Sequence, residues 1–283
     1  MTILDQKPPD VFSQSGHFEP IHEAHAIEQV VFVLQIDRSL DDVSFSEARR
    51  VAEQFKQELP GQAQIQGLTF AISFPGPIPP SPTVGTVFHR IGPDGTLENE
   101  LRVERTSVTF RTSLYTRWDA VWSQASKYFK AIVPIYASQA MITGISLNYL
   151  DKFIWAGTLT ECSPSLLLRT GSNYLCPHVF EANDLWHSHT GAFIRIDNST
   201  KRLLNINVDY LDENRPDGAR RIVAITTVQT DLLNQPGYEP SAVAENDAIE
   251  FLDIHMQSLH VFGKKVFGNI INDEMSRRIA LID

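Results

Sequence analysis

The middle of the chain contains repeated runs in which apolar and polar residues alternate, and this pattern restricts the folds available to it. The clearest run covers 202–211, in which the alternating apolar residues are Leu204, Ile206, Val208 and Tyr210. A two-residue period is typical of a strand that buries one face, because successive side chains point to opposite sides. Pro-Asp-Gly turn sequences stand at 93–95 and 216–218, where proline and glycine supply the backbone angles of tight turns. The pattern predicts antiparallel hairpins.

The same criteria predict strands along most of the chain. The β-branched, apolar run at 30–36 is typical of a strand that is buried on both faces. Further strands are expected at about 63–74, 84–91, 97–104, 107–115, 141–155, 172–180, 187–196 and 220–231. Residues 157–168 fit either a short helix or a loop. Five prolines within 75–82 predict an extended surface loop, because proline cannot donate hydrogen bonds to a sheet.

Amphipathic patterns predict long helices between these strands. The first begins at a capping box, Ser44-Phe45-Ser46-Glu47, and stops at Pro60-Gly61. In the second, Thr116 is the expected cap, Pro134 the expected end, and Trp118 and Trp122 share the apolar stripe. Aromatic side chains at helical spacing indicate core more often than a ligand platform, so we expect both indoles in the core. The third helix spans about 246–268, and Asn272-Asp273-Glu274 opens a short terminal helix.

The order of these elements predicts an α+β fold with two similar halves, at 27–136 and 137–283. Each half is expected to be a curved antiparallel meander sheet packed on one long amphipathic helix, which covers the apolar face of the sheet. Residues 1–26 are expected to form an irregular N-terminal lead-in. No alignable repeat accompanies this order, so the internal duplication is a structural hypothesis. We expect the halves to form one compact unit.

Charge and composition narrow the classes of partner. The 34 acidic residues exceed the 24 basic ones, which gives a net charge of −10 and disfavours nucleic-acid binding. No apolar run approaches the roughly 18 residues of a membrane span, and the N-terminus does not resemble a secretory signal. Cys162 and Cys176 lack the CxxC spacing and are expected to be reduced thiols. These features predict a cytoplasmic protein.

Short catalytic motifs do not identify a reaction. The sequence contains neither GxGxxG nor GxxxxGK[ST], and it also lacks GxSxG and HExxH. The absence of these motifs excludes the enzyme classes that such motifs identify. It does not exclude an enzyme of another class. No cofactor is predicted.

One histidine cluster raises a metal-site hypothesis. His187 and His189 would point to the same side of a strand, as two ligands of one metal ion must. His178 or the Cys176 thiolate could then supply a third ligand and leave an open coordination position for hydrolysis. No carboxylate stands at a diagnostic interval, and a solvated pair of strand histidines explains the pattern more simply.

A polar row forms the second candidate site. Asn205, Asn207 and Asp209 share one face of their strand, and Asn148 and Tyr149 lie on another strand. If the row lines a cavity between sheet and helix, these side chains are predicted to bind a polar ligand. If the row faces solvent, it is the wet side of an antiparallel sheet, which is the interpretation we favour.

Other histidines carry weaker signals. His22 and His25 have i,i+3 spacing without a third partner, and they fall in the lead-in. His255 and His260 lie on the third long helix. His255 is close to the apolar stripe, so we expect a partly buried imidazole with a hydrogen-bond partner rather than a base.

Three segments resemble a known family: 114–122 (LYTRWDAVW), 142–153 (ITGISLNYLDKF), and 252–260 (LDIHMQSLH) leading to Phe267. Together they resemble a sporadically distributed prokaryotic family of uncharacterised proteins of about this length. The family favours arginine where this chain has Asn148 and asparagine where it has Asp151. The resemblance covers nearly the whole chain and implies an α+β fold in a prokaryotic protein. It implies no activity.

Two functions of different classes follow. The first, which we favour, is a non-enzymatic binding or interaction protein that recognises a protein partner or a polar small ligand. The second is a metal-assisted hydrolase built on His178, His187 and His189. The exposed edges of an antiparallel sheet also offer a route to a homodimer.

Overall fold

The computed structural model describes residues 16–66, 83–182, 184–215, 218–240 and 247–281. Within these ranges the strands are β1 (His17–Pro20), β2 (Ile27–Ile36), β3 (Gly61–Gln66), β4 (Thr83–Ile91), β5 (Leu97–Glu104), β6 (Ser107–Thr112), β7 (Ile142–Ala156), β8 (Trp186–Arg195), β9 (Thr200–Arg215) and β10 (Gly218–Leu233). The α-helices are α1 (Asp42–Ala52), α2 (Trp118–Ala137), α3 (Ala248–Ile270) and α4 (Asp273–Arg278). The predicted loop at 75–82 lies outside the described residues.

The described strands form one ten-stranded sheet in the order β3-β4-β5-β6-β2-β7-β10-β9-β8, with β1 also paired to β7. Every pairing is antiparallel, so the α+β class with an antiparallel sheet is confirmed. The long strands β2 and β7 form the centre. Outward from β2 come β6, β5, β4 and β3, and outward from β7 come β10, β9 and β8.

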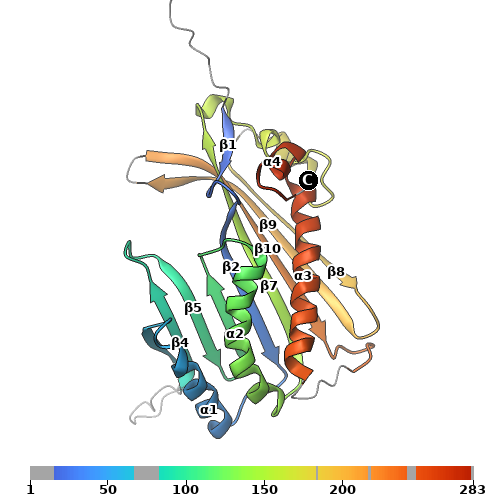
Figure 1. The fold of residues 1–283 in the computed structure, drawn as a ribbon. Helices are drawn as coiled ribbons and strands as arrows, with labels where there is room; N and C mark the ends of the chain where they lie inside the picture. Colours follow the sequence, from blue (N-terminus) through green and yellow to red (C-terminus); the bar gives the residue numbers. More distant parts are fainter. Residues whose placement is uncertain (1–15, 67–82, 183, 216–217, 241–246, 282–283) are drawn as a thin grey trace, which may run out of the picture.

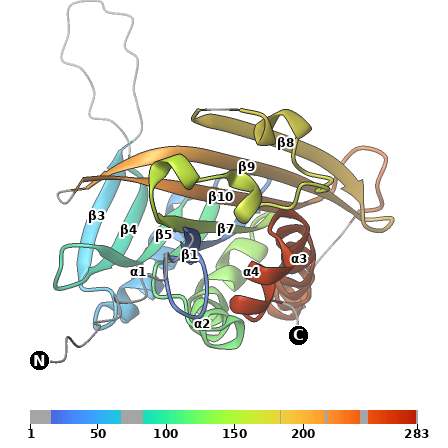
Figure 2. The ribbon, with the colours of Figure 1, turned by 90° about the horizontal axis from the view of Figure 1, so that it is seen from above.

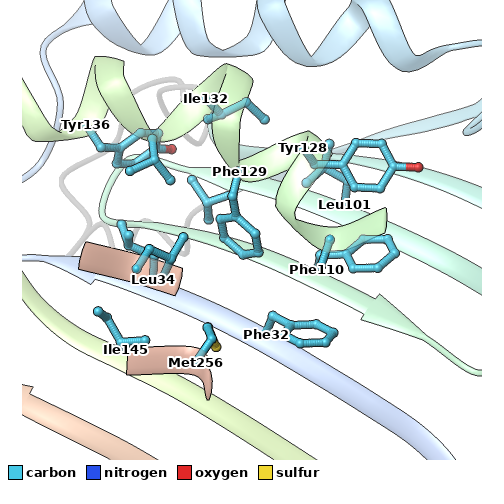
Figure 3. Packing of buried hydrophobic residues seen from close by; sticks show 14 of the residues in the cluster. Phe32, Leu34, Leu101, Phe110, Tyr128, Phe129, Ile132, Tyr136, Ile145 and Met256 are labelled. Atoms are coloured by element: carbon cyan, nitrogen blue, oxygen red, sulfur yellow. The ribbon is translucent and has the colours of Figure 1, made fainter. Parts of the chain in front are cut away.

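The helices cover one face of this sheet (Figures 1 and 2). Two clusters of buried side chains lie between the layers. One packs α1, α2 and the N-terminal half of α3 against β2 and its neighbours, and Figure 3 shows Phe32, Phe110 and Met256 in it. The other packs the C-terminal half of α3 and α4 against β7, β9 and β10. None of the helices within the described residues has the length and apolar character that crossing a bilayer requires.

Helix ends differ from the sequence predictions. The first helix begins at Asp42, where Asp41 rather than Ser44 is the cap and accepts a hydrogen bond from the Ser44 amide. The second helix begins at Trp118 without a side-chain cap. It continues through Pro134 to Ala137, because Val133 and Tyr136 are buried in the core and hold the last turn in place.

Two further predictions were wrong. The lead-in contains a strand, β1, which pairs with the end of β7. The predicted strand at 172–180 is instead irregular, with a 3₁₀ turn at Pro177–Phe180. Leu175 and Val179 of this segment are buried in the second cluster, so their apolar character reflects packing onto the sheet rather than strand formation. The predicted terminal helix is confirmed, and Asn272 caps it by accepting a hydrogen bond from the Met275 amide.

Candidate functional site

A cavity of about 190 Å³ lies between the sheet and the helices, beside the start of α2 and the C-terminal half of α3. Its floor comes from neighbouring strands: Ile27 of β2, Tyr149 and Asp151 of β7, and Thr227 of β10. Ile27 pairs with Asp151 and Thr227 pairs with Tyr149 across the sheet, so these side chains share the helix-facing side. The centre of the sheet therefore forms the floor of the cavity.

Aromatic rings form much of the wall. The imidazole of His260 stacks on the indole of Trp118, with ring centroids 4.0 Å apart and planes within 2° of parallel. The Tyr149 hydroxyl lies 3.0 Å from His260 Nδ1, and the imidazole tautomer decides which atom donates the hydrogen bond. Tyr115 meets the Tyr149 ring edge-on, with centroids 6.4 Å apart. The walls are therefore fixed by ring contacts between α2, α3 and β7.

Hydrogen bonds hold α2 against α3 at this point. The Trp118 indole donates to Gln257 Oε1 at 2.7 Å, and one turn later the Trp122 indole donates to Asp253 Oδ1 at 2.5 Å. Both tryptophans are buried in the core, as their spacing predicts. Trp118 also lines the cavity, so it contributes both to the core and to the candidate site.

Asp151 is the most unusual group on the floor. Only 3% of this residue is exposed. None of the hydrogen bonds or ion pairs among the described residues involves its carboxyl group, in line with burial being the sole cause of its pKa shift. Burial raises the pKa of Asp151 to about 8. At neutral pH the carboxyl is mostly protonated, so it can donate a hydrogen bond or lose its proton to pair with a cation.

The other titratable groups near the floor are also shifted by burial. Desolvation, followed by the charge of Asp151, raises the pKa of Tyr115 to about 12. Burial is also the largest cause of the raised pKa of Tyr149, with smaller contributions from Tyr115 and Asp151. Burial and then Lys264 lower the pKa of His260 to about 4, so this imidazole is neutral at neutral pH. The floor therefore carries little charge when the cavity is empty.

The mouth of the cavity has a different character. Arg117, just before α2, and Lys264 of α3 line it, and both are exposed. Neither side chain forms an ion pair with the described residues. His25 also lines the cavity, and its Nδ1 atom is buried without a hydrogen-bond partner. Burial and then His22 lower the pKa of His25. Two unpaired cations therefore stand above a nearly uncharged floor.

Glycine lets α3 lie close to the sheet beside the cavity. A Cβ atom on Gly263 would lie 2.5 Å from Nε2 of Gln229, which is too close. Gln229 lies two positions after Thr227 on β10 and is fully buried, and both of its amide atoms lack a partner among the described residues. The helix can sit at this distance only because residue 263 has no side chain.

The predicted ligand-binding residues fall on two faces. Tyr149 lines the cavity. Asn148 lies on the opposite face of the sheet in the same row as Asn205, and Asn207 and Asp209 follow on that face in the next rows. This is the face without helices (Figure 2). The structure thus separates Tyr149 from the polar row.

The histidines of the metal hypothesis lie on or near that opposite face. His187 Nδ1 is 2.6 Å from Asp209 Oδ1, and His189 Nδ1 is 2.5 Å from Asn207 Oδ1, both as cross-strand pairs. His178 lies in the 3₁₀ turn at Pro177–Phe180. Within the described ranges, no group of at least three His, Cys, Asp or Glu side chains is placed to hold a metal ion. The metal hypothesis stays an untested prediction.

Sequence reasoning missed most of the cavity. Asp151 stood out only as a departure from a family pattern, Arg117 only as part of the 114–122 segment, and Lys264 did not stand out at all. A signal was available for Asp151, because it is an acid at an inward position of a strand whose neighbouring inward residues are Tyr149 and Phe153. Arg117, Lys264 and His260 come together only through the packing of α2 beside α3.

Comparison with known proteins does not identify the chain. No family model matches it, and no curated protein is detectably similar to it. The candidate site therefore stands on its own geometry.

Proposed function

We propose that this chain is a small-molecule binding protein whose ligand occupies the cavity between β7, β10, α2 and α3. The observation that carries the proposal is the Asp151 carboxyl, which is buried on the cavity floor and has no protein partner among the described residues. A buried polar group without a partner costs about 1–3 kcal/mol. A ligand that offers a hydrogen bond or an opposite charge removes that cost when it binds.

The shape and lining of the cavity support this proposal. A cavity of about 150 Å³ accepts benzene, so one of about 190 Å³ has room for roughly eight non-hydrogen atoms. Aromatic walls with a few convergent polar groups are typical of small-molecule sites. The walls are cross-linked by the Trp118–Gln257 and Tyr149–His260 hydrogen bonds, so little ordering is needed when a ligand enters.

A ligand screen with a blocked cavity tests the proposal. Small metabolites are screened by thermal shift against the wild type, Thr227→Phe and Thr226→Phe. Thr227 points into the cavity, and the adjacent Thr226 points to the opposite face of the same strand, so the second variant is a matched control. We expect ligands that raise the Tm of the wild type and of Thr226→Phe but not of Thr227→Phe. Ligands that a well-folded Thr227→Phe retains would contradict the proposed site.

The metal-assisted hydrolase is the second function class, and its test is independent. Purified protein is analysed for zinc and manganese, with a His187→Ala/His189→Ala variant as the control. Stoichiometric metal that the variant loses would favour the hydrolase. A protein without metal, whose stability does not respond to chelators, would reject it.

The internal duplication belongs among our proposals. It is supported by the strand order, in which a meander extends outward from each of the central strands β2 and β7. It is also supported by the positions of α2 and α3, each of which follows the last strand of its meander in the chain. A cytoplasmic location is likewise proposed, and the free thiols of Cys162 and Cys176 are compatible with it. The family resemblance and the homodimer stay predictions.

A further inference from the structure

The cavity has an ionisable acid on its buried floor and two cations at its exposed mouth. Among the residues that the structure describes, Asp151 is the only acid that lines the cavity, and it lies on the buried floor. Arg117 and Lys264 are the exposed cations at the mouth, and neither has an acidic partner within the described ranges. A ligand that is only cationic would be repelled at the mouth, and a ligand that is only anionic would offer no opposite charge to the Asp151 carboxylate. A molecule with one charge of each sign satisfies both ends.

The tyrosine rings beside Asp151 favour a cation at the floor. Tyr115 and Tyr149 lie close enough for the charge of Asp151 to act on both hydroxyl groups. An ammonium group is attracted to the faces of aromatic rings, and this attraction grows when water is excluded. An ammonium beside Asp151 would therefore gain a charged hydrogen bond and contacts with aromatic rings.

The size of the cavity limits the distance between the two charges. Room for roughly eight non-hydrogen atoms corresponds to an ammonium, a carboxylate and about four methylene groups. We propose that the cavity binds a short ω-amino acid, with its ammonium on Asp151 and its carboxylate between Arg117 and Lys264. This inference rests on the proposed function and names the chemical class of its ligand.

Binding has a proton signature because the pKa of Asp151 is raised to about 8 in the empty cavity. The groups around it are Tyr115 and Arg117 before α2, Tyr149 of β7, His25 before β2, and His260 and Lys264 of α3. The two tyrosines stay protonated and both imidazoles have lowered pKa values, so Asp151 is the group expected to titrate. When an ammonium pairs with it, the carboxyl releases its proton to the buffer. We expect close to one proton released per ligand at about pH 7.

Calorimetry with matched probes tests the inference. The probes are 5-aminopentanoate, pentanoate, pentylamine and 2-aminopentanoate, each titrated in buffers with different ionisation enthalpies. We expect 5-aminopentanoate to bind at least about tenfold more tightly than the others and to release a proton. The 2-amino isomer has the same composition but carries both charges at one end, so it isolates the placement of the two charges.

Variants connect each end of the probe to its proposed partner. Asp151→Asn preserves the size of the side chain, and we expect it to weaken 5-aminopentanoate by about tenfold or more, abolish proton release and leave pentanoate unchanged. Arg117→Gln/Lys264→Gln, both at exposed positions, should weaken 5-aminopentanoate and pentanoate while leaving pentylamine unchanged. Circular dichroism and Tm measurements verify that each variant is folded.

The possible outcomes separate this inference from the proposed function. Equal binding of pentanoate, of pentylamine or of 2-aminopentanoate would overturn the ω-amino acid class, and so would binding without proton release. Failure of all the probes would also overturn the class. In either case the proposed function would survive if the wider screen yields ligands that Thr227→Phe excludes, and it would fail if Thr227→Phe retains them.

Discussion

Asp151 and Asp231 are buried carboxyl groups on neighbouring strands, and their surroundings differ in one respect. Both lie on the helix-facing side of the sheet, with exposed fractions of 3% and 1%. Asp231 accepts hydrogen bonds from Arg202 Nε at 2.6 Å and from Nη2 at 2.9 Å, and His255 Nδ1 lies 2.8 Å away. Asp151 has no such partner within the described chain. The comparison distinguishes an acid whose partners are supplied by the fold from one whose position leaves room for a ligand.

The surroundings of Asp231 indicate a structural role. Arg202 also donates to the Ser258 hydroxyl of α3 at 3.0 Å and lies over the Phe262 ring, so the pair joins β9 and β10 to the helix. The sequence prediction that His255 has a hydrogen-bond partner agrees with this geometry. A buried ion pair specifies how elements pack, whereas a buried acid in a cavity reduces stability until something binds to it.

Removing the partner of Asp231 should have the largest effect. Arg202→Met leaves a buried carboxylate without its two charged hydrogen bonds, and we expect a loss of about 3–5 kcal/mol in the free energy of unfolding. Urea denaturation at neutral pH measures it. The double change Arg202→Met/Asp231→Leu should recover most of the loss, because it removes both charges. A loss below about 1 kcal/mol in the single variant would mean that Asp231 does not depend on Arg202, and the claim that the two acids differ in their partners would fail.

Asp151→Asn should have an effect that depends on pH. Because the folded pKa is raised to about 8, the folded protein binds the proton more tightly than the unfolded chain does. The stability that this carboxyl contributes is therefore lost as pH rises from about 4 to 8. The asparagine variant lacks this loss, so relative to wild type it should gain about 4 kcal/mol between pH 4.5 and 8.5. Urea denaturation of both proteins measures this change. If the difference in free energy of unfolding between the variant and the wild type stays constant across this pH range, Asp151 is not an unpaired buried acid.

His260 gives a smaller effect at acidic pH. Its folded pKa is lowered to about 4, so the unfolded chain takes up this proton first as pH falls through about 6.5. The free energy of unfolding of the wild type should therefore fall by about 1–2 kcal/mol between pH 6.5 and 4.5 because of His260, after allowance for solvent screening. His260→Phe keeps a ring against Trp118 and should lack that loss. Denaturation of both proteins at the two pH values measures the difference.

The smallest effect is expected on the opposite face of the sheet. Asp209 also has a partner, His187, but their side chains are 31% and 58% exposed. Asp209→Asn should change the free energy of unfolding by about 0.5 kcal/mol or less, because exposed ion pairs contribute little. A loss comparable to that of Arg202→Met would show that burial is not what distinguishes these acids.

Local sequence patterns predicted most of the fold. The alternation in 202–211 and the arms at 84–91 and 97–104 correspond to β9, β4 and β5, because a sheet with one apolar face imposes a two-residue period. The boundaries that failed depend on tertiary contacts. Pro134 lies inside α2 because the turn after it is buried, and 172–180 is apolar because it packs on the sheet.

The candidate site was less accessible to sequence reasoning than the fold. The polar row at Asn205, Asn207 and Asp209 shows a clear period, yet that period is also the pattern of a face without helices. Asp151 is a single acid on an otherwise apolar face of its strand, and one residue cannot form a repeating pattern that sequence analysis would detect. The cavity combines β2, β7, β10, α2 and α3, and their contacts are non-local, so no short motif could predict which side chains meet there.

The titration of the Asp151 carboxyl in the ligand-free protein tests the central claim most directly. Carbon NMR of the aspartate carboxyl signals, assigned by comparison with Asp151→Asn, follows each group from acid to alkaline pH. We predict a midpoint near 8 for Asp151. A midpoint at or below 4 would mean that the protein already stabilises the ionised carboxylate. This result would contradict the claim that Asp151 has no partner in the protein and is available to a ligand.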